Sequence, residues 1–136
     1  KTDVTYYGYG PYESYSDKHR ASWIDRFDTT VDDMFEDYVF PQENGSHYNC
    51  QYASVGNLYA KGKKPFSFQA SRYSEKELDE KAHNFELVPS DGIYVALDYK
   101  QSGIGSNSCG PRLAEKYQLR EEKIEWEISI RFDNKN

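Results

Sequence analysis

Strict alternation of apolar and polar side chains is the feature that most constrains how this chain of 136 residues folds. The alternation is clearest over residues 124–132, where Ile, Trp, Ile, Ile and Phe are separated by Glu, Glu, Ser and Arg. A period of two places the apolar side chains on one face of an extended strand and the polar ones on the other. Residues 93–99 show the same pattern directly after the turn dipeptide Asp91-Gly92. The chain is therefore expected to form half-buried strands.

Shorter alternating segments add to these strands. Residues 48–53 and 66–70 alternate over a few positions, and a loop is expected at residues 61–65, where Gly, Pro and Lys residues fall together. Residues 23–27 and 38–40 are weaker strand candidates, since their apolar positions are few. Strands of such lengths are common in antiparallel sheets.

One helix is well marked in the sequence. Ser74 and Glu77 have the spacing of a capping box, in which each side chain satisfies a free backbone amide at the start of a helix. This spacing predicts a helix over residues 75–82, with Leu78 and Ala82 facing inward.

Together these elements predict an all-β fold with one short helix, arranged as an antiparallel β-sandwich. A second helix over residues 30–38 stays open, because its apolar period is ambiguous. The sequence contains no internal repeat, low-complexity tract or linker, so residues 1–136 are expected to form a single domain. The first residues lack an initiator Met and an apolar signal core, which is typical of a piece cut from a longer chain.

Charge and composition argue against several classes of protein. Lys and Arg number 17 against 23 Asp and Glu, and the net charge of −6 argues against nucleic-acid binding. No apolar run approaches the roughly 20 residues of a membrane-spanning helix, so no membrane span is expected. The 13 Tyr, 7 Phe and 2 Trp can supply most of a core, and those at the surface would suit contact with sugars or with another protein.

The two cysteines, Cys50 and Cys109, form no metal-binding motif. Neither belongs to a C-x-x-C pair and the histidines are isolated, so no metal site is expected. Two thiols at this spacing favour free cysteines in a reducing compartment over a disulfide, and hence a cytoplasmic location.

A glycine-rich loop over residues 103–111 is the most distinctive candidate for function. It lacks the third glycine of a dinucleotide fingerprint and the Lys-Ser/Thr pair of a Walker loop, so it is not a phosphate cradle. Two interpretations stay open: a loop that presents Asn107, Ser108 and Cys109 to a ligand, or a purely structural turn. The many acidic residues single out no carboxylate pair for glycoside hydrolysis. Acids of the right type are Glu13, Asp17, Glu43 and Asp98.

Four stretches of the chain resemble, in order, motifs of the family 2 glycoside hydrolases of the β-galactosidase type. They read G-Y-G-P-Y-E-S-Y-S-D-K over residues 8–18, Y-V-F-P-Q-E-N-G over 38–45, F-S-F with S-R-Y-S over 66–74, and G-I-G-S-N-S-C-G-P over 103–111. Because the motifs run in order along nearly the whole chain, the resemblance is more specific than any one of them. The segment resembled is the C-terminal, small-chain domain of these enzymes.

The resemblance implies a fold and an activity. The fold would be the C-terminal portion of a galactose-mutarotase-like supersandwich. The parent enzyme would hydrolyse terminal non-reducing β-D-galactose residues in β-galactosides such as lactose, with retention of configuration. Its catalytic glutamates would lie on a central β/α barrel together with Mg²⁺ and a monovalent cation. This chain would carry no catalytic residue and no cofactor.

The resemblance also implies partners. The chain would dock on the barrel, which belongs either to the rest of the same polypeptide or to a large subunit. On its own it would be inactive, and its uncovered sheet edges would favour a homo-oligomer. The alternative from a different class is a free-standing carbohydrate-binding or mutarotase-like module.

Two sets of residues are candidates for sugar contact under this resemblance. Cys109 matches the position that reaches the sugar site, and Ser108 and Asn107 precede it on the same loop. A thiol cannot offer the broad face of an aromatic ring, so stacking is not expected from Cys109. A vestigial sugar site of the mutarotase type would instead use Glu43, Arg72 and His83.

Overall fold

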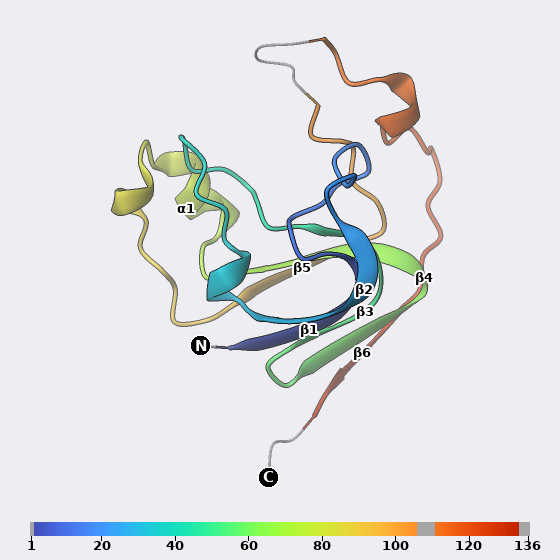
Figure 1. Ribbon diagram of the computed structural model, residues 1–136, viewed down its shortest axis with the longest axis horizontal. Helices are drawn as coiled ribbons and strands as arrows, with labels where there is room; N and C mark the ends of the chain where they lie inside the picture. The colour runs from blue at the N-terminus through green and yellow to red at the C-terminus, as the bar shows by residue number, and fades with distance from the viewer. Residues whose placement is uncertain (1, 106–110, 134–136) are drawn as a thin grey trace.

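The described part of the chain, residues 2–105 and 111–133 of a computed structural model, is dominated by one curved antiparallel sheet (Figure 1). Its strands are β1 (Asp3–Gly10), β2 (Trp23–Thr30), β3 (His47–Val55), β4 (Leu58–Ser71), β5 (Tyr94–Asp98) and β6 (Ile128–Phe132). They are ordered β2-β1-β3-β4-β5. The strand β6 also pairs with β4, along residues 58–62, whereas β5 pairs with residues 67–71. The mostly β, antiparallel class is confirmed. The described residues form one sheet, so the second layer of the expected sandwich, and the supersandwich, stay predictions.

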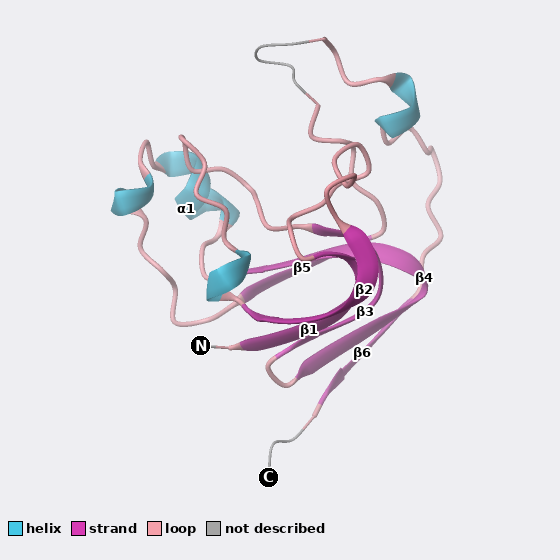
Figure 2. Cartoon of the chain, in the orientation of Figure 1, coloured by secondary structure: helices cyan, strands magenta, loops and turns pink. Residues whose placement is uncertain are grey.

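In the described residues, helical structure lies in the loops on one side of this sheet (Figure 2). The helix α1 spans Glu75–Glu80, and 3-10 turns lie at η1 (Asp32–Met34), η2 (Asn84–Glu86) and η3 (Glu115–Tyr117). The predicted cap of α1 is confirmed, because the Ser74 hydroxyl accepts a hydrogen bond of 3.0 Å from the Glu77 amide. The prediction that the helix reaches and buries Ala82 is wrong, since Lys81 is already extended and Ala82 is exposed. None of the described helices is long and apolar enough to cross a membrane.

Long-range pairing corrects several local predictions. The expected loop at residues 61–65 is part of the long strand β4, because β3 and β6 pair with its first residues from both sides. Residues 38–40 form no strand, with bends at 39 and 40, and the only helical structure in residues 30–38 is the turn η1. Of residues 124–132, only those in β6 find a partner strand. The strands predicted at 23–27, 48–53, 66–70 and 93–99 are confirmed within β2, β3, β4 and β5.

The inner face of the sheet carries the hydrophobic core. The η1 segment packs on buried side chains of β1, β3 and β4, and the cluster contains Val4, Tyr6, Val31, Met34, Cys50, Ala53, Val55, Ala60, Phe66, Phe68 and Ala70. β1 is not evident from sequence, because two of its inward positions are Gly8 and Gly10, which hide the apolar alternation. A Cβ on Gly8 would lie 2.4 Å from the Cys50 Sγ, so the close packing of β1 on β3 requires glycine there. Cys50 itself is a buried free thiol, and the prediction for Cys109 lies outside the described residues.

Tyrosines cover part of the outer face of the sheet. Tyr7, Tyr52 and Tyr59 stack across β1, β3 and β4, with successive ring centres 6.2 and 5.9 Å apart. The Arg131 guanidinium of β6 lies 4.2 Å from the Tyr59 ring centre and extends the row. Cross-strand packing therefore accounts for part of the high Tyr content without any ligand.

Candidate functional site: the polar junction around Glu13 and Asp17

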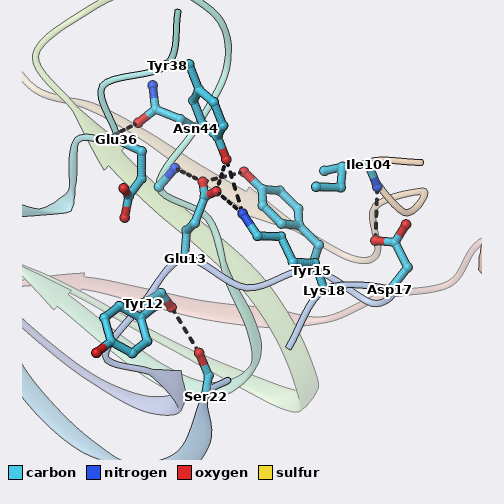
Figure 3. A network of polar contacts seen from close by, with 11 residues as sticks. Tyr12, Glu13, Tyr15, Asp17, Lys18, Ser22, Glu36, Tyr38, Asn44 and Ile104 are labelled. Carbon is cyan, nitrogen blue, oxygen red and sulfur yellow. Dashed lines mark hydrogen bonds and ion pairs between the residues drawn. The ribbon is translucent and has the colours of Figure 1, made fainter. Parts of the chain in front are cut away.

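The first two motif stretches meet at the carboxylate of Glu13, in the segment that joins β1 to β2 (Figure 3). Lys18 Nζ donates to its Oε1 over 2.6 Å, and the Tyr38 hydroxyl donates to the same oxygen. The Tyr15 hydroxyl donates to Oε2 over 3.2 Å, and the Gly45 amide donates to Oε2 over 3.0 Å. One side chain, only 7% exposed, therefore joins two stretches that are distant in the sequence.

The Glu13 carboxylate is held in its charged form. Burial by itself raises its pKa, but hydrogen bonds from Lys18, Tyr38 and the Gly45 amide outweigh burial and leave the pKa below its usual value. A general acid of a glycosidase needs the opposite shift, toward neutral pH. Glu13 is therefore a fixed anion that organises its neighbours rather than a proton donor.

Asp17 attaches the fourth motif stretch to the first. Its Oδ1 accepts a hydrogen bond from the Ile104 amide and its Oδ2 one from the Gly105 amide, each 3.0 Å long. A Cβ on Gly103 would lie 2.4 Å from the carboxylate carbon of Asp17, so this close approach requires glycine. We call this arrangement the Asp17 anchor. It gives the glycine-rich loop a fixed starting position.

The loop over residues 36–45 is shaped from within. Asn44 Oδ1 accepts a hydrogen bond of 2.9 Å from the Glu36 amide, and Asn44 Nδ2 donates to the Gln42 carbonyl over 2.9 Å. Gly45 adopts a φ of +71°, in the left-handed region that favours glycine. The Asn-Gly pair thus closes the loop and turns the following backbone into the junction.

His47 links the junction to the sheet core. Its Nδ1 lies 3.0 Å from the Tyr9 carbonyl oxygen, and because a carbonyl only accepts, this nitrogen carries the proton. The imidazole centre lies 4.2 Å from the Tyr6 ring centre and 5.6 Å from that of Phe68. Burial lowers the pKa of His47 to about 4, so the ring is neutral at pH 7.

An open pocket of about 700 Å³ lies beside Glu13. Its lining combines aromatic rings with charges of both signs, and includes Tyr12, Tyr38, Lys18, Arg20, Glu36 and Asp37. Burial and the nearby Glu13 charge raise the pKa of Glu36. Aromatic surface with a few polar groups is the chemistry of a small-molecule or sugar site.

The residues predicted to contact sugar from the glycine-rich loop, Asn107, Ser108 and Cys109, lie outside the described residues. The start of the same loop is described, and the Asp17 anchor holds it. Sugar contact by the three loop residues stays a prediction.

The side chains of the predicted vestigial sugar site have separate surroundings. Arg72 Nε binds Asp32 Oδ1 at 3.0 Å, and His83 Nδ1 lies 3.2 Å from Glu86 Oε2. Glu43 is exposed on the loop between η1 and β3. The structure gives no contact that joins the three, and their use as sugar ligands stays a prediction.

Sequence reasoning named Glu13 and Asp17 only among many acids, and it missed Lys18 and Tyr38 as partners of Glu13. The signal lay in the motifs: three of these residues stand in one stretch, and Tyr38 begins the next. Nothing in the sequence alone showed that the two stretches meet. Within the two described ranges, no group of three His, Cys, Asp or Glu residues is placed to hold a metal ion.

Comparison with known proteins assigns these motifs to one family. A family model described as beta galactosidase small chain matches residues 1–132. A beta-galactosidase of Actinobacillus pleuropneumoniae is 50% identical over 130 residues, which cover 96% of this chain and 12% of that relative. A beta-galactosidase of Staphylococcus xylosus is 43% identical over 133 residues, which cover 95% of this chain and 13% of that relative. A beta-galactosidase of Streptococcus thermophilus is 34% identical over 112 residues, 78% of this chain. The chain therefore belongs to the β-galactosidase small-chain family, as the ordered motifs predicted.

Proposed function

We propose that this chain is a non-catalytic part of a retaining β-galactosidase that removes terminal non-reducing β-D-galactose from β-galactosides such as lactose. The family match over residues 1–132 carries the proposal. The chain spans only 12–13% of the length of the first two relatives, so the activity is proposed for the whole enzyme. We propose a cytoplasmic location, which the free thiol of Cys50 supports.

Within that enzyme the polar junction acts as an anchor. Glu13 and Asp17 have both carboxylate oxygens engaged by donors of this chain, so neither is free to protonate a leaving group or to attack an anomeric carbon. We assign the acid and the nucleophile to glutamates of the β/α barrel, along with the Mg²⁺ and monovalent cation that the resemblance implies. The chain stabilises the enzyme by docking on that barrel.

The glycine-rich loop is proposed to complete the sugar site. The Asp17 anchor fixes Ile104 and Gly105, shortly before Asn107, Ser108 and Cys109 in the sequence, and this supports the proposal. Small polar side chains there would hydrogen-bond sugar hydroxyls instead of stacking on the ring. Cys109→Ala in the intact enzyme should then alter KM or transfer to acceptors, with kcat nearly unchanged.

Activity measurements on the separate and joined parts test the proposal. The intact enzyme is expected to hydrolyse a chromogenic β-galactoside, and this chain alone to show no turnover above the uncatalysed rate. Adding the chain to an enzyme that lacks it is expected to restore activity. Turnover by the chain alone would contradict the non-catalytic role, and an inactive intact enzyme would contradict the β-galactosidase assignment.

The pocket beside Glu13 favours a second candidate function, a free-standing carbohydrate-binding or mutarotase-like module. The ring of Tyr12 is exposed at this pocket, where it could stack on a sugar. Calorimetry of the chain with galactose tests this candidate. Saturable binding that Tyr12→Ala removes would promote it, and the absence of heat would exclude it.

A further inference from the structure

Three apolar side chains project from the loops beside the junction. Val39 is 87% exposed, Phe40 is 67% exposed and Phe85 is 85% exposed. The first two belong to the loop after η1, and Phe85 belongs to η2. We call these three side chains the apolar tip. Large apolar groups gathered at a surface mark places where another surface is bound.

The two segments that carry the apolar tip are fastened together. Asn84 Nδ2 donates to the Tyr38 carbonyl over 2.6 Å and also donates to the Asp37 carboxylate. Val39 follows Tyr38 and Phe85 follows Asn84, so the hydrogen bond joins the residues that directly precede two of the exposed side chains. Figure 1 shows both segments on the same side of the sheet. The two segments that carry the apolar tip are therefore joined directly, close to its side chains in the sequence.

The loop that carries the first two of these side chains is held at several points. Asn44 bonds the Glu36 amide, and Glu13 binds the Gly45 amide. Pro41, directly after the exposed pair, is buried. The exposure of the apolar tip is thus built into the fold and does not come from a detached loop. Such pre-organised groups lose little conformational entropy when a partner covers them.

We propose that the apolar tip is a docking surface for the rest of the β-galactosidase, and that the surface it meets is apolar with Lys or Arg at its border. The relatives carry the matched segment as 12–13% of one longer chain, which makes the remainder of that chain the expected occupant. Glu36 and Asp37 precede the tip in the same loop, and Asp37 is bound by Asn84, which precedes Phe85, so these carboxylates favour basic side chains on the surface that the tip meets. The inference rests on the proposed function, because it needs a parent enzyme.

Hydroxyl-radical oxidation of the intact enzyme, read at Phe40 by mass spectrometry, tests the docking. The rate is compared with that of the urea-unfolded enzyme. An interface that buries Phe40 should slow its oxidation about tenfold, whereas a side chain left two-thirds exposed should slow by less than about twofold. A slowing below twofold would overturn the proposal. Protection that disappears when copies of the intact enzyme separate from one another on dilution would assign the tip to a second copy, and would overturn it too.

Phe40→Ser tests whether the contact contributes to stability. In the intact enzyme it should speed heat inactivation about tenfold, as the loss of an interface anchor does. Phe132→Ser is the matched control, because Phe132 on β6 is also 67% exposed and lies outside the apolar tip. Equal inactivation of the Phe40→Ser and Phe132→Ser enzymes would overturn the proposal.

The activity of the unheated enzyme separates this inference from the proposed function. An enzyme that hydrolyses a β-galactoside while Phe40 oxidises freely would overturn only the docking surface. An enzyme with a protected Phe40 that hydrolyses no β-galactoside would overturn only the function.

Discussion

The inner face of the sheet and the polar junction at the end of β1 hold this chain together in different ways. On the inner face, Val4, Tyr6 and Phe68 are buried in apolar contact, which gains free energy from many weak contacts at once. At the junction, Glu13 and Asp17 bind backbone amides and side chains through a few charge-assisted hydrogen bonds. The core can exchange one apolar side chain for another of similar volume, whereas the junction depends on individual atoms.

The family motifs divide between these two regions. The first, second and fourth stretches meet at the junction, and the third contributes Phe66 and Phe68 to the core. The core therefore stabilises the sheet, and the hydrogen bonds of the junction position the loops relative to the sheet. Substitutions in each region can measure how far the two are independent.

Removal of an aromatic ring from the core should have the largest effect on stability and should disrupt the inner face of the sheet. Phe68 is fully buried, with the ring centres of Tyr6 and His47 at 5.3 and 5.6 Å. Phe68→Ala is expected to lower the free energy of unfolding by about 3–5 kcal/mol, through lost burial and the cavity left behind. Urea unfolding of the chain measures this loss. Phe85→Ala, at an exposed position, is the control and should cost less than about 0.5 kcal/mol. Similar costs for the two would contradict the core described above.

Acid should weaken the link between the two regions, because His47 lies between them. Its pKa of about 4 in the fold is below the 6.5 of an unperturbed histidine, so between these values the unfolded chain binds a proton that the folded chain does not. The contribution of His47 to the free energy of unfolding is therefore fully present above about pH 6.5. It is lost as the pH falls toward 4, which lowers the free energy of unfolding by about 3 kcal/mol in total. Urea unfolding at several pH values measures the slope.

His47→Asn separates this titration from that of the carboxylates. Asn keeps an N–H donor for the Tyr9 carbonyl but does not titrate, so the slope between pH 6.5 and about 4.5 should flatten. The lowered pKa of Glu13 adds stability that is present above its usual value of 4.5 and is lost as the pH falls further. An unchanged slope above pH 4.5 in the variant would refute the assignment to His47.

Glu13→Gln should disrupt the junction while leaving the core intact. Glutamine keeps one acceptor oxygen but turns an amide group toward donors such as the Gly45 amide or Lys18. The expected loss is about 1–3 kcal/mol, because buried donors are left without an acceptor. Urea unfolding at pH 7 measures it against Glu122→Gln, an exposed glutamate at which the change should stay within about 0.5 kcal/mol. Equal stability of the two variants would show that the free-energy cost of burying the Glu13 carboxylate cancels the gain from its hydrogen bonds.

Most of the sheet could be predicted from the sequence, because alternation is a local property. The alternation of side chains predicts β5 from residues 93–99 and β3 from residues 48–53. β1 could not be found in this way, since Gly8 and Gly10 occupy inward positions where an apolar side chain would be expected. The first residues of β4 also escaped prediction, because their strand conformation depends on pairing with distant strands.

The junction could not be predicted from periodicity, because its contacts are long-range. Glu13 and the Gly45 amide are 32 positions apart, and Asp17 and the Gly105 amide are 88 positions apart. The family resemblance still pointed to the right stretches, since family motifs mark residues that a shared structure requires even where no local pattern exists. It did not show which atoms meet.

The finest test of the comparison is at the Asp17 anchor, where the expected effect is smallest. Gly103→Ala would place its Cβ 2.4 Å from the Asp17 carboxylate carbon and displace that carboxylate from the Ile104 and Gly105 amides. The loop can detach while the sheet stays folded, so the cost is limited to local opening, about 1 kcal/mol. Hydrogen exchange at the two amides should then speed about fivefold. Gly92→Ala is the control, because the nearest atom to its Cβ would be Ser90 Oγ at 3.7 Å.

The clash between an alanine at position 103 and the Asp17 carboxylate can also be removed by replacing Asp17. A double variant therefore tests whether the two substitutions act through the same contact. In an Asp17→Ala chain, a Cβ on Gly103 meets no carboxylate, and Gly103 is not among the residues with positive φ, so Ala fits its backbone. The double variant should therefore exchange the Ile104 and Gly105 amides no faster than Asp17→Ala alone. Additive effects of the two substitutions would show that glycine is required at position 103 by its own backbone conformation and not by the approach of the Asp17 carboxylate. Full non-additivity would show that one contact carries the attachment of this loop, in contrast to the core, where the loss of any single contact is shared among many neighbours.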